Sequence, residues 1–289
     1  KIGMPNIFVS TFGNTWAIAA ELVAIGCYKQ LHLLSKNQSL KKFYDKHTDF
    51  DKIDEIWLIC THDKKTNEAL NEFQKWLSYF QDLPLPLVRL LGLEKLEDLT
   101  SELECRQMSD FIYRTVLQAR EHARDGQLIL SLAGGRKTMS SDMQRAADFF
   151  GCNALIHIAN NNFPVRSPDD FKVELPDDVA NELFIVEVQK NTKYNFVVDI
   201  EPRITSKDYS IDYNRFNKPS LKLYNKINER LSNAESLHYN AYRFRTGQSN
   251  QTIFHGLQQL PPVTLQKLEN EQPDYEWLKQ LPKTDLHCH

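Results

Sequence analysis

The sequence predicts an α/β fold, built as an open parallel sheet with helices on both faces. Three observations predict it. Short apolar runs recur through the first 160 residues, at intervals that leave room for a helix between them. The stretches between these runs carry apolar side chains at steps of three and four, as one face of a helix does. Polar, glycine-bearing turns follow the first and fourth runs, and the whole alternation is typical of a parallel sheet with right-handed connections.

The expected elements follow from this pattern. The predicted strands are residues 6–9, 56–60, 85–91, 127–132 and 155–158. The predicted helices are residues 16–26, 69–80, 101–126 and 139–150, with a short additional helix at 40–44. The motif Ser101-x-x-Glu104 has the form of a capping box, so the longest helix should start there. Asn14 is expected to cap the first helix and Gly151 to end the last.

The expected strand order is 3-2-1-4-5, which places a topological switch point between the first and fourth strands. Ligands of open α/β sheets bind at the carboxyl ends of the strands beside such a point. The loops Ser10–Thr15 and Ala133–Thr138 follow these two strands. Thr61, His62 and Asn160 follow neighbouring strands and are expected to rim the same crevice. The sheet is therefore expected to be Rossmann-like, with a ligand site at this end.

The turn after the fourth predicted strand, within Ser131–Ser140, carries the strongest chemical signal. Gly134 and Gly135 let the backbone adopt unusual dihedral angles and approach a ligand closely. Arg136 and Lys137 add two positive charges where a helix presents free N–H groups and the positive end of its dipole. These features predict a phosphate-binding cradle. A tight turn with merely solvated basic residues is the alternative.

Two common phosphate motifs do not fit this turn. A P-loop aligned on Lys137-Thr138 would need glycines at the positions that Ser131 and Arg136 occupy. The G-x-G-x-x-G spacing of dinucleotide-binding proteins is also missing. The sequence therefore argues against an ATPase of the P-loop type.

Composition and charge exclude further classes of protein. Hydrophobic residues make up 41% and charged residues 25% of the 289 residues, which is ordinary for a globular protein. A net charge of −3 provides no general basic surface for duplex DNA, and no apolar run is long enough to cross a membrane. Five scattered cysteines and an N-terminus without a signal-peptide pattern lead us to expect reduced thiols and a cytoplasmic location.

The pattern changes after residue 160. The expected elements are a hairpin of strands 184–188 and 196–200 at the sheet edge, a polar linker at 201–218, and helices at 221–231 and 274–281. Tyrosine and arginine side chains cluster at 239–245. Such a cluster can stack on nucleic-acid bases, although packing against the first domain is the favoured interpretation.

The C-terminal segment Leu281–His289 has the sequence LPKTDLHCH. In a strand over residues 284–289, His287 and His289 would point to the same side and could share one Zn²⁺, although an H-x-H pair also occurs by chance. The segment resembles the first barrel strand of the adenosine deaminase superfamily. The resemblance implies that the two histidines are zinc ligands in a complete deaminase domain. The remaining ligands and the general acid/base are absent here, so we expect no cofactor and no deamination by this chain alone.

The segment SLAGGRKTMS, residues 131–140, resembles the signature of the CRISPR-associated Rossmann-fold sensor domains, called CARF domains. This resemblance extends over residues 1–160 and includes the loop at 10–14. A CARF domain ahead of a deaminase-like domain is the layout of the CRISPR-associated adenosine deaminases. The expected domains are a CARF domain at 1–200, a transmission region at 201–280 and the first strand of the deaminase barrel at 281–289.

The CARF resemblance implies a ligand and an assembly. CARF domains form two-fold dimers and bind cyclic oligoadenylates across the interface, which switches on an attached effector. We therefore expect a homodimer, with or without further assembly of dimers, that binds cyclic tetra- or hexa-adenylate in antiviral defence and regulates a deaminase acting on adenosine or ATP. The expected ligand-binding residues are Ser10, Thr11, Phe12, Gly13, Asn14, Thr61, His62, Ala133, Gly134, Gly135, Arg136, Lys137, Thr138 and Asn160.

Some CARF domains also cleave their ligand, and this ring nuclease activity is a second hypothesis. The ribose 2′-OH attacks the adjacent phosphate without a metal, so the protein only fixes the geometry and stabilises charge. Lys137 is the candidate for charge stabilisation, with Ser10 or Thr11 as positioning groups. A third hypothesis is a Rossmann-like nucleotide- or nucleic-acid-binding module outside CRISPR. Only the sensor hypothesis accounts for the C-terminal segment.

Overall fold

The computed structural model describes residues 4–27, 38–47, 52–80, 82–159, 184–190 and 204–245. The chain divides into two compact units, residues 1–228 and residues 229–289. In the second unit, the described residues 229–245 are the C-terminal part of a helix. Several expected features lie outside the described residues, namely Asn160, the strand at 196–200, the helix at 274–281, and His287 and His289.

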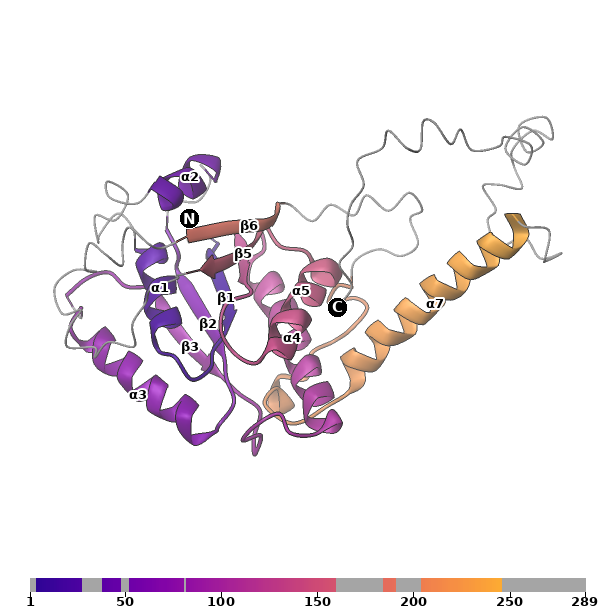
Figure 1. Ribbon diagram of the computed structural model, residues 1–289, viewed down its shortest axis with the longest axis horizontal. Coiled ribbons are helices and arrows are strands. Elements are labelled where there is room, and N and C mark those ends of the chain that lie inside the picture. Colours follow the sequence, from indigo (N-terminus) through magenta and orange to yellow (C-terminus); the bar gives the residue numbers. More distant parts are fainter. Residues whose placement is uncertain are drawn as a thin grey trace. The chain divides into compact units, whose positions relative to one another are not determined.

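The first unit is built on a six-stranded sheet with the order β3-β2-β1-β4-β5-β6 (Figure 1). The strands are β1 (Ile7–Thr11), β2 (Glu55–Ile59), β3 (Leu87–Leu91), β4 (Leu128–Ser131), β5 (Ala154–Ala159) and β6 (Phe184–Lys190). The first five are parallel, which confirms the Rossmann-like open sheet and the order 3-2-1-4-5. Ser10 of β1 pairs with Ser131 of β4, so the two strands end at the same level beside the switch point.

Helices cover both faces of the sheet (Figure 1). The helices are α1 (Ala17–Gly26), α2 (Gln38–Lys46), α3 (Lys64–Ser78), α4 (Glu102–Ala123) and α5 (Lys137–Phe150). Helices α1 and α3 pack together on one face and α4 and α5 on the other, while α2 lies beside β6. Because both faces are covered, every residue of β1 and β2 is buried, as expected for near-continuous apolar strands in a parallel sheet.

The start of α4 confirms the predicted capping box. Ser101 Oγ accepts a hydrogen bond from the backbone N–H of Glu104, and the Glu104 carboxylate accepts one from the backbone N–H of Ser101. At the end of α5, Gly151 has a φ of 73°, a conformation that glycine adopts without a steric penalty. This confirms the predicted end of that helix.

The prediction that Asn14 caps the first helix is wrong. Helix α1 begins at Ala17, and its N-cap is Trp16, which already has helical backbone angles and makes no side-chain capping bond. Asn14 therefore lies too far before the helix to reach its free N–H groups. Its amide oxygen instead lies 3.4 Å from the hydroxyl of Thr66, in the first turn of α3.

The two edges of the sheet differ. The edge strand β3 is parallel to β2, whereas the edge strand β6 is antiparallel to β5, with a register shift between Leu155 and Ile156. Strand β6 corresponds to the first arm of the predicted hairpin and extends to Lys190. The second arm of that hairpin lies outside the described residues.

Residues 204–228 pack within the first unit. They contain the short 3-10 helix η3 (Tyr213–Arg215) and the start of α7 (Lys222–Arg245), which is longer than the predicted helix. The carboxylate of Asp110, fully buried in α4, accepts hydrogen bonds from the backbone N–H groups of Leu223 and Tyr224 at 2.8 and 2.9 Å. An aspartate at the first turn of a helix satisfies free N–H groups and favours the positive dipole end.

Among the helices within the described ranges, none has both the length and the apolar character that a membrane span requires.

Candidate functional site

The candidate site lies where the loops after β1 and β4 meet. A Cβ atom added to Gly13 would lie only 3.1 Å from the backbone nitrogen of Gly135. One added to Gly134 would lie 2.3 Å from the carbonyl oxygen of Thr11. The two loops therefore touch through backbone, and a side chain at Gly134 would separate them. The glycine turn lies at the switch point, where the sequence predicts it.

Ser10 and Thr11 hold these loops together. Both side chains are fully buried. The Ser10 hydroxyl donates to the carbonyl oxygen of Ala133 at 3.0 Å, and the Thr11 hydroxyl donates to that of Gly134 at 2.8 Å. These contacts fix the path of the glycine turn. The structure thus gives both hydroxyls a partner inside the protein and places them outside the cavity described next.

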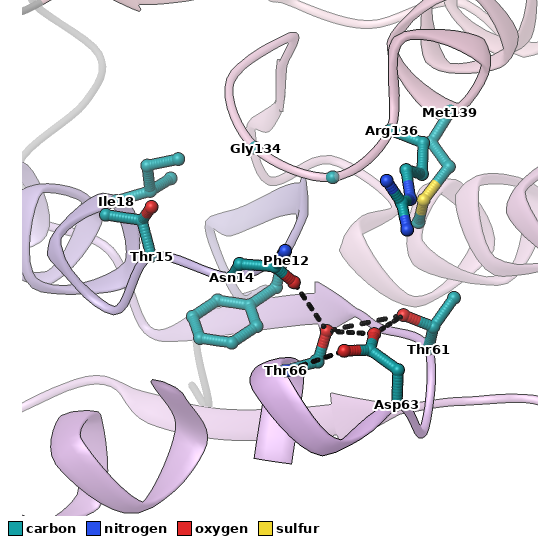
Figure 2. A pocket seen from close by; sticks show the side chains of 12 residues that line it. Phe12, Asn14, Thr15, Ile18, Thr61, Asp63, Thr66, Gly134, Arg136 and Met139 are labelled. Carbon is teal, nitrogen blue, oxygen red and sulfur yellow. Dashed lines mark hydrogen bonds between the residues drawn. The ribbon is translucent and has the colours of Figure 1, made fainter. Parts of the chain in front are cut away.

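A cavity of about 230 Å³ opens beside the two loops (Figure 2). It is lined by Phe12, Gly13, Asn14, Thr15, Ile18, Thr61, Asp63, Thr66, Gly134, Gly135, Arg136 and Met139. Ile18, Thr66 and Met139 belong to the first turns of α1, α3 and α5, so three helices point their N-terminal ends at one space. Ligand sites of open α/β sheets have this arrangement.

The start of α5 presents a row of free backbone donors. Gly134 and Gly135 both have positive φ values, 85° and 67°, which turn the chain sharply from β4 into the helix. The N-cap of α5 is Arg136, whose side chain makes no capping bond. Within the part of the chain that the structure describes, the backbone N–H groups of residues 135–138 donate no hydrogen bond. Such groups at a helix N-terminus suit an anion.

The two cations of the turn differ in their surroundings. The guanidinium of Arg136 pairs with the carboxylate of Asp98, with 3.1 Å between Nε and Oδ1 and a second, shorter contact through Nη2. Lys137 is exposed, and among the described residues it has no ion-pair partner. Its ammonium group is therefore available to an anion at the helix N-terminus. An anion that recruits Arg136 must compete with Asp98.

The wall across the cavity from Gly134 is a hydrogen-bonded polar cluster (Figure 2). The carboxylate of Asp63 caps α3 by accepting from the backbone N–H of Thr66 at 3.0 Å. It also accepts from the hydroxyl groups of Thr61 at 2.8 Å and Thr66 at 2.5 Å. Partial burial raises the pKa of Asp63, but these hydrogen bonds outweigh it and hold the pKa below its usual range. The cluster is therefore a fixed, ionised acceptor.

The structure brings together only part of the predicted site. Of the described candidates, the cavity is lined by Phe12, Gly13, Asn14, Thr61, Gly134, Gly135 and Arg136. His62 is exposed and lies outside the lining, with its ring against Gly92. Ala133 is buried, while Lys137 and Thr138 are exposed at the start of α5. Asn160 lies outside the described residues.

Thr15 lies in the predicted site loop Ser10–Thr15, although it is not among the expected ligand-binding residues; four further lining residues lie outside both predicted loops, namely Ile18, Asp63, Thr66 and Met139. A signal existed for two of them. Asp63 comes three residues after the predicted strand 56–60 and precedes a helical pattern, as an N-cap residue does, and Thr66 is the matching N3 position. Ligands of such sheets bind at the carboxyl ends of the strands beside the switch point, and the helix that follows β2 begins at this same end. Including the capping residues of that helix in the predicted site would have found both.

No site for a metal ion is present among the described residues, since no three histidine, cysteine, aspartate or glutamate side chains are grouped there. The predicted zinc ligands His287 and His289 lie outside them.

One family of known proteins matches this chain. The model of a family described as CRISPR-associated protein NE0113 matches residues 44–200, which is more than half of the chain. The matched region contains Asp63, Asp98 and the whole glycine turn, whereas β1 and its loop precede it. No curated protein matches the chain. The chain therefore belongs to the family of CRISPR-associated protein NE0113, and a role in CRISPR defence follows from that membership.

Proposed function

We propose that this chain is a sensor domain that binds a cyclic oligoadenylate, the tetra- or hexa-adenylate ring, and regulates an attached effector. The observation that carries the proposal is the row of backbone N–H groups at residues 135–138, which have no acceptor among the described residues, with Lys137 beside it. A phosphate accepts several such hydrogen bonds at once, and each is strengthened by the charge of the ligand. The family membership supports a ligand that belongs to CRISPR defence.

The cavity supports a nucleotide rather than inorganic phosphate. Opposite the phosphate donors, the ionised Asp63 and the carboxamide of Asn14 face the same space. A carboxylate accepts hydrogen bonds from ribose hydroxyls or from the adenine amino group, and it repels a second phosphate. A ligand with a phosphate at one end and hydrogen-bond donors at the other fits both walls.

The size of the cavity supports a shared ligand. A space of about 230 Å³ is below the range of roughly 300–1,000 Å³ usual for small-molecule sites, so it is too small to enclose a whole ring. A ring of four or six nucleotides needs several such units. Two copies related by a two-fold axis would present two cradles to opposite sides of one ring. A homodimer is therefore part of the proposal.

Ring cleavage is not favoured as a second function. Two of its three candidate residues, Ser10 and Thr11, already donate their hydroxyl hydrogen bonds to the carbonyl groups of Ala133 and Gly134. Lys137 remains as an exposed cation that can stabilise charge on a phosphate.

The effector under this proposal is a zinc-dependent adenosine or ATP deaminase, because the segment Leu281–His289 resembles the first barrel strand of that superfamily.

Calorimetry at low ionic strength tests the proposal. The purified chain is titrated with cyclic tri-, tetra- and hexa-adenylate, and with linear oligoadenylate and ATP as competitors for the same donors. We expect the tetra- or hexa-adenylate ring to bind at one ring per two chains, more tightly than either linear ligand. Binding of no ring would overturn the proposal, and preference for the linear ligands would favour the nucleotide-binding module instead.

Replacing Lys137 locates the site. The Lys137→Ala variant should lose about tenfold or more in ring affinity, because a hydrogen bond to a charged group contributes about 1.5–3 kcal/mol. Lys42→Ala is the matched control, since Lys42 is exposed on α2 and outside the cavity lining. Equal affinity of the Lys137→Ala variant and the wild type would mean that the phosphates bind elsewhere.

A further inference from the structure

We propose that Asp98 is a built-in counter-ion that a bound phosphate displaces from Arg136, and that this exchange loosens the link between the β3–α4 loop and the chain leading into α7. The inference rests on the proposed function, because it specifies how the same site is regulated. It assigns roles to Asp98 and Glu94, two acidic side chains outside the cavity lining.

The first step concerns competition for one guanidinium. Arg136 is the N-cap of α5, next to the free N–H groups, and both of its bonded nitrogen atoms face the carboxylate of Asp98. The pair is open to water, with 54% of the Arg136 side chain and 32% of the Asp98 side chain exposed. An exposed pair of this kind contributes little to stability, because solvent screens both charges. A phosphate held by several backbone donors is therefore able to replace the carboxylate.

The second step follows the loop from Asp98 to Glu94. At Glu94 the loop meets the segment before α7. The backbone N–H of Glu94 donates to the carbonyl oxygen of Asn217 at 2.9 Å, and the Glu94 carboxylate accepts from the Asn217 side chain at 2.8 Å. The Lys218 ammonium also pairs with this carboxylate and lowers the pKa of Glu94 below its usual range. The β3–α4 loop thus contacts Arg136 at one end, through Asp98, and the segment before α7 at the other, through Glu94.

The turn between these two contacts is strained. Lys95 has a φ of 61°, a left-handed conformation that is sterically unfavourable for a residue with a Cβ atom. Leu93 and Leu96 are buried on either side of it, so the loop has fixed anchor points and one turn under strain between them. Strained backbone of this kind persists only where surrounding contacts enforce it. Release of Asp98 removes one of the contacts that hold this loop.

The third step joins the segment to α7. Arg114 of α4, with only 4% of its side chain exposed, donates to the carbonyl groups of Phe216 and Lys218. Asp110, also in α4, accepts hydrogen bonds from the backbone N–H groups of Leu223 and Tyr224 in the first turn of α7. Residues 216–218 are therefore the point where the exposed contact from Glu94 and the buried contacts from α4 act on the same backbone. A change at Glu94 alters one of the two restraints on the start of α7.

The test combines hydrogen exchange with calorimetry on the full chain. Exchange is followed in peptides covering residues 92–98 and 216–224, with and without cyclic tetra- or hexa-adenylate. The variants are Asp98→Asn, Glu94→Gln and the control Glu97→Gln, which removes an exposed carboxylate from the same loop that has no ion pair among the described residues. Circular dichroism checks that each variant is folded.

The expected results are specific to a connection that runs from Asp98 through Glu94 to residues 216–218. The ring should speed exchange at the Glu94 amide and in 216–218 of the wild type. Asp98→Asn should produce that faster exchange without any ring, and it should bind the ring about two- to fivefold more tightly because the competing carboxylate is gone. Glu94→Gln should also tighten ring binding, by a smaller factor, since coupling between two sites is reciprocal. Glu97→Gln should behave as the wild type does.

The failure of this inference is separable from the failure of the proposed function. If no ring binds the wild type, the proposed function fails, and the ligand-free exchange of Asp98→Asn still tests the link between Asp98 and residues 216–218. Unchanged exchange in ligand-free Asp98→Asn overturns the inference whether or not rings bind. Ring binding that leaves exchange in 92–98 and 216–218 unaltered overturns it as well.

Discussion

Three of the arginine–carboxylate pairs among the described residues differ mainly in how far they are withdrawn from water. Arg114 and Asp110 have side chains that are 4% and 0% exposed. The corresponding exposures are 44% and 11% for Arg89 and Glu55, and 54% and 32% for Arg136 and Asp98. The chemistry of the three pairs is the same, and the distances between closest atoms are similar. We therefore infer that the surrounding solvent decides which pair is permanent and which a ligand can exchange.

The gradient of burial follows the architecture. The buried pair joins α4 to the segment that enters α7, and every partner of its carboxylate is inside the protein. The intermediate pair lies across β2 and β3, where Trp57 and His122 add hydrogen bonds to Glu55. The exposed pair lies at the rim of the cavity. If the proposed displacement of Asp98 holds, a scaffold contact and a ligand-responsive contact are made from the same two residue types.

The largest effect should come from the buried pair. Asp110→Asn leaves the guanidinium of Arg114 buried without its counter-charge, and such a change costs about 3–5 kcal/mol. Urea denaturation monitored by circular dichroism measures the loss in the free energy of unfolding. The double variant Asp110→Asn with Arg114→Met should recover more than 1 kcal/mol of it, because the unpaired charge is removed. A loss below 1 kcal/mol in Asp110→Asn would place this pair with the exposed ones.

The contribution of the intermediate pair, Arg89 and Glu55, to the free energy of unfolding should depend on pH. Burial raises the pKa of Glu55, but hydrogen bonds from Arg89, Trp57 and His122 outweigh it and lower the pKa to about 2 from the ordinary 4.5. A carboxyl group with a lowered folded-state pKa stabilises the protein above about pH 4.5, and this contribution is lost as the pH falls from 4.5 towards 2. The full contribution corresponding to this shift is about 3 kcal/mol.

The measurement compares the wild type with Glu55→Gln by urea denaturation at pH 7 and at several pH values between 5 and 2.5. The stability difference between the two proteins should be largest at neutral pH and should shrink across the acidic window. Using the difference cancels the titration of other carboxyl groups. A difference that stays constant from pH 7 to pH 2.5 would contradict the assignment of that stability to the ionised Glu55.

The fold was predictable because local signals agreed with one another. The apolar runs, the capping box at Ser101 and the glycine after α5 were each visible within a short window, and the strand order followed a general rule for such sheets. The position of the glycine turn at the switch point followed in turn. No contact between distant residues was needed for these predictions.

The inner details of the site were not predictable in the same way. The sequence pattern ended the first strand at residue 9, whereas β1 continues through Thr11, so that Ser10 and Thr11 lie inside the sheet with their hydroxyls satisfied. The partner of Arg136 is 38 residues away in the chain, on a loop without any motif. Pairings of this kind depend on the folded arrangement of loops, which periodicity and spacing do not encode.

The smallest effect on stability should come from the exposed pair. Asp98→Asn should lower the free energy of unfolding by less than about 1 kcal/mol, because solvent already screens both charges. Raising the salt concentration to about 0.5 M shortens the screening length to a few ångströms and should abolish the difference from the wild type. The loss in Asp110→Asn should persist in the same salt, since water and ions do not reach that pair.

A loss above 2 kcal/mol in Asp98→Asn, or one insensitive to salt, would make the pair structural and would argue against its displacement by a phosphate. A negligible and salt-sensitive effect on stability, together with a clear effect on ring affinity, is the combination that an exchangeable counter-ion requires.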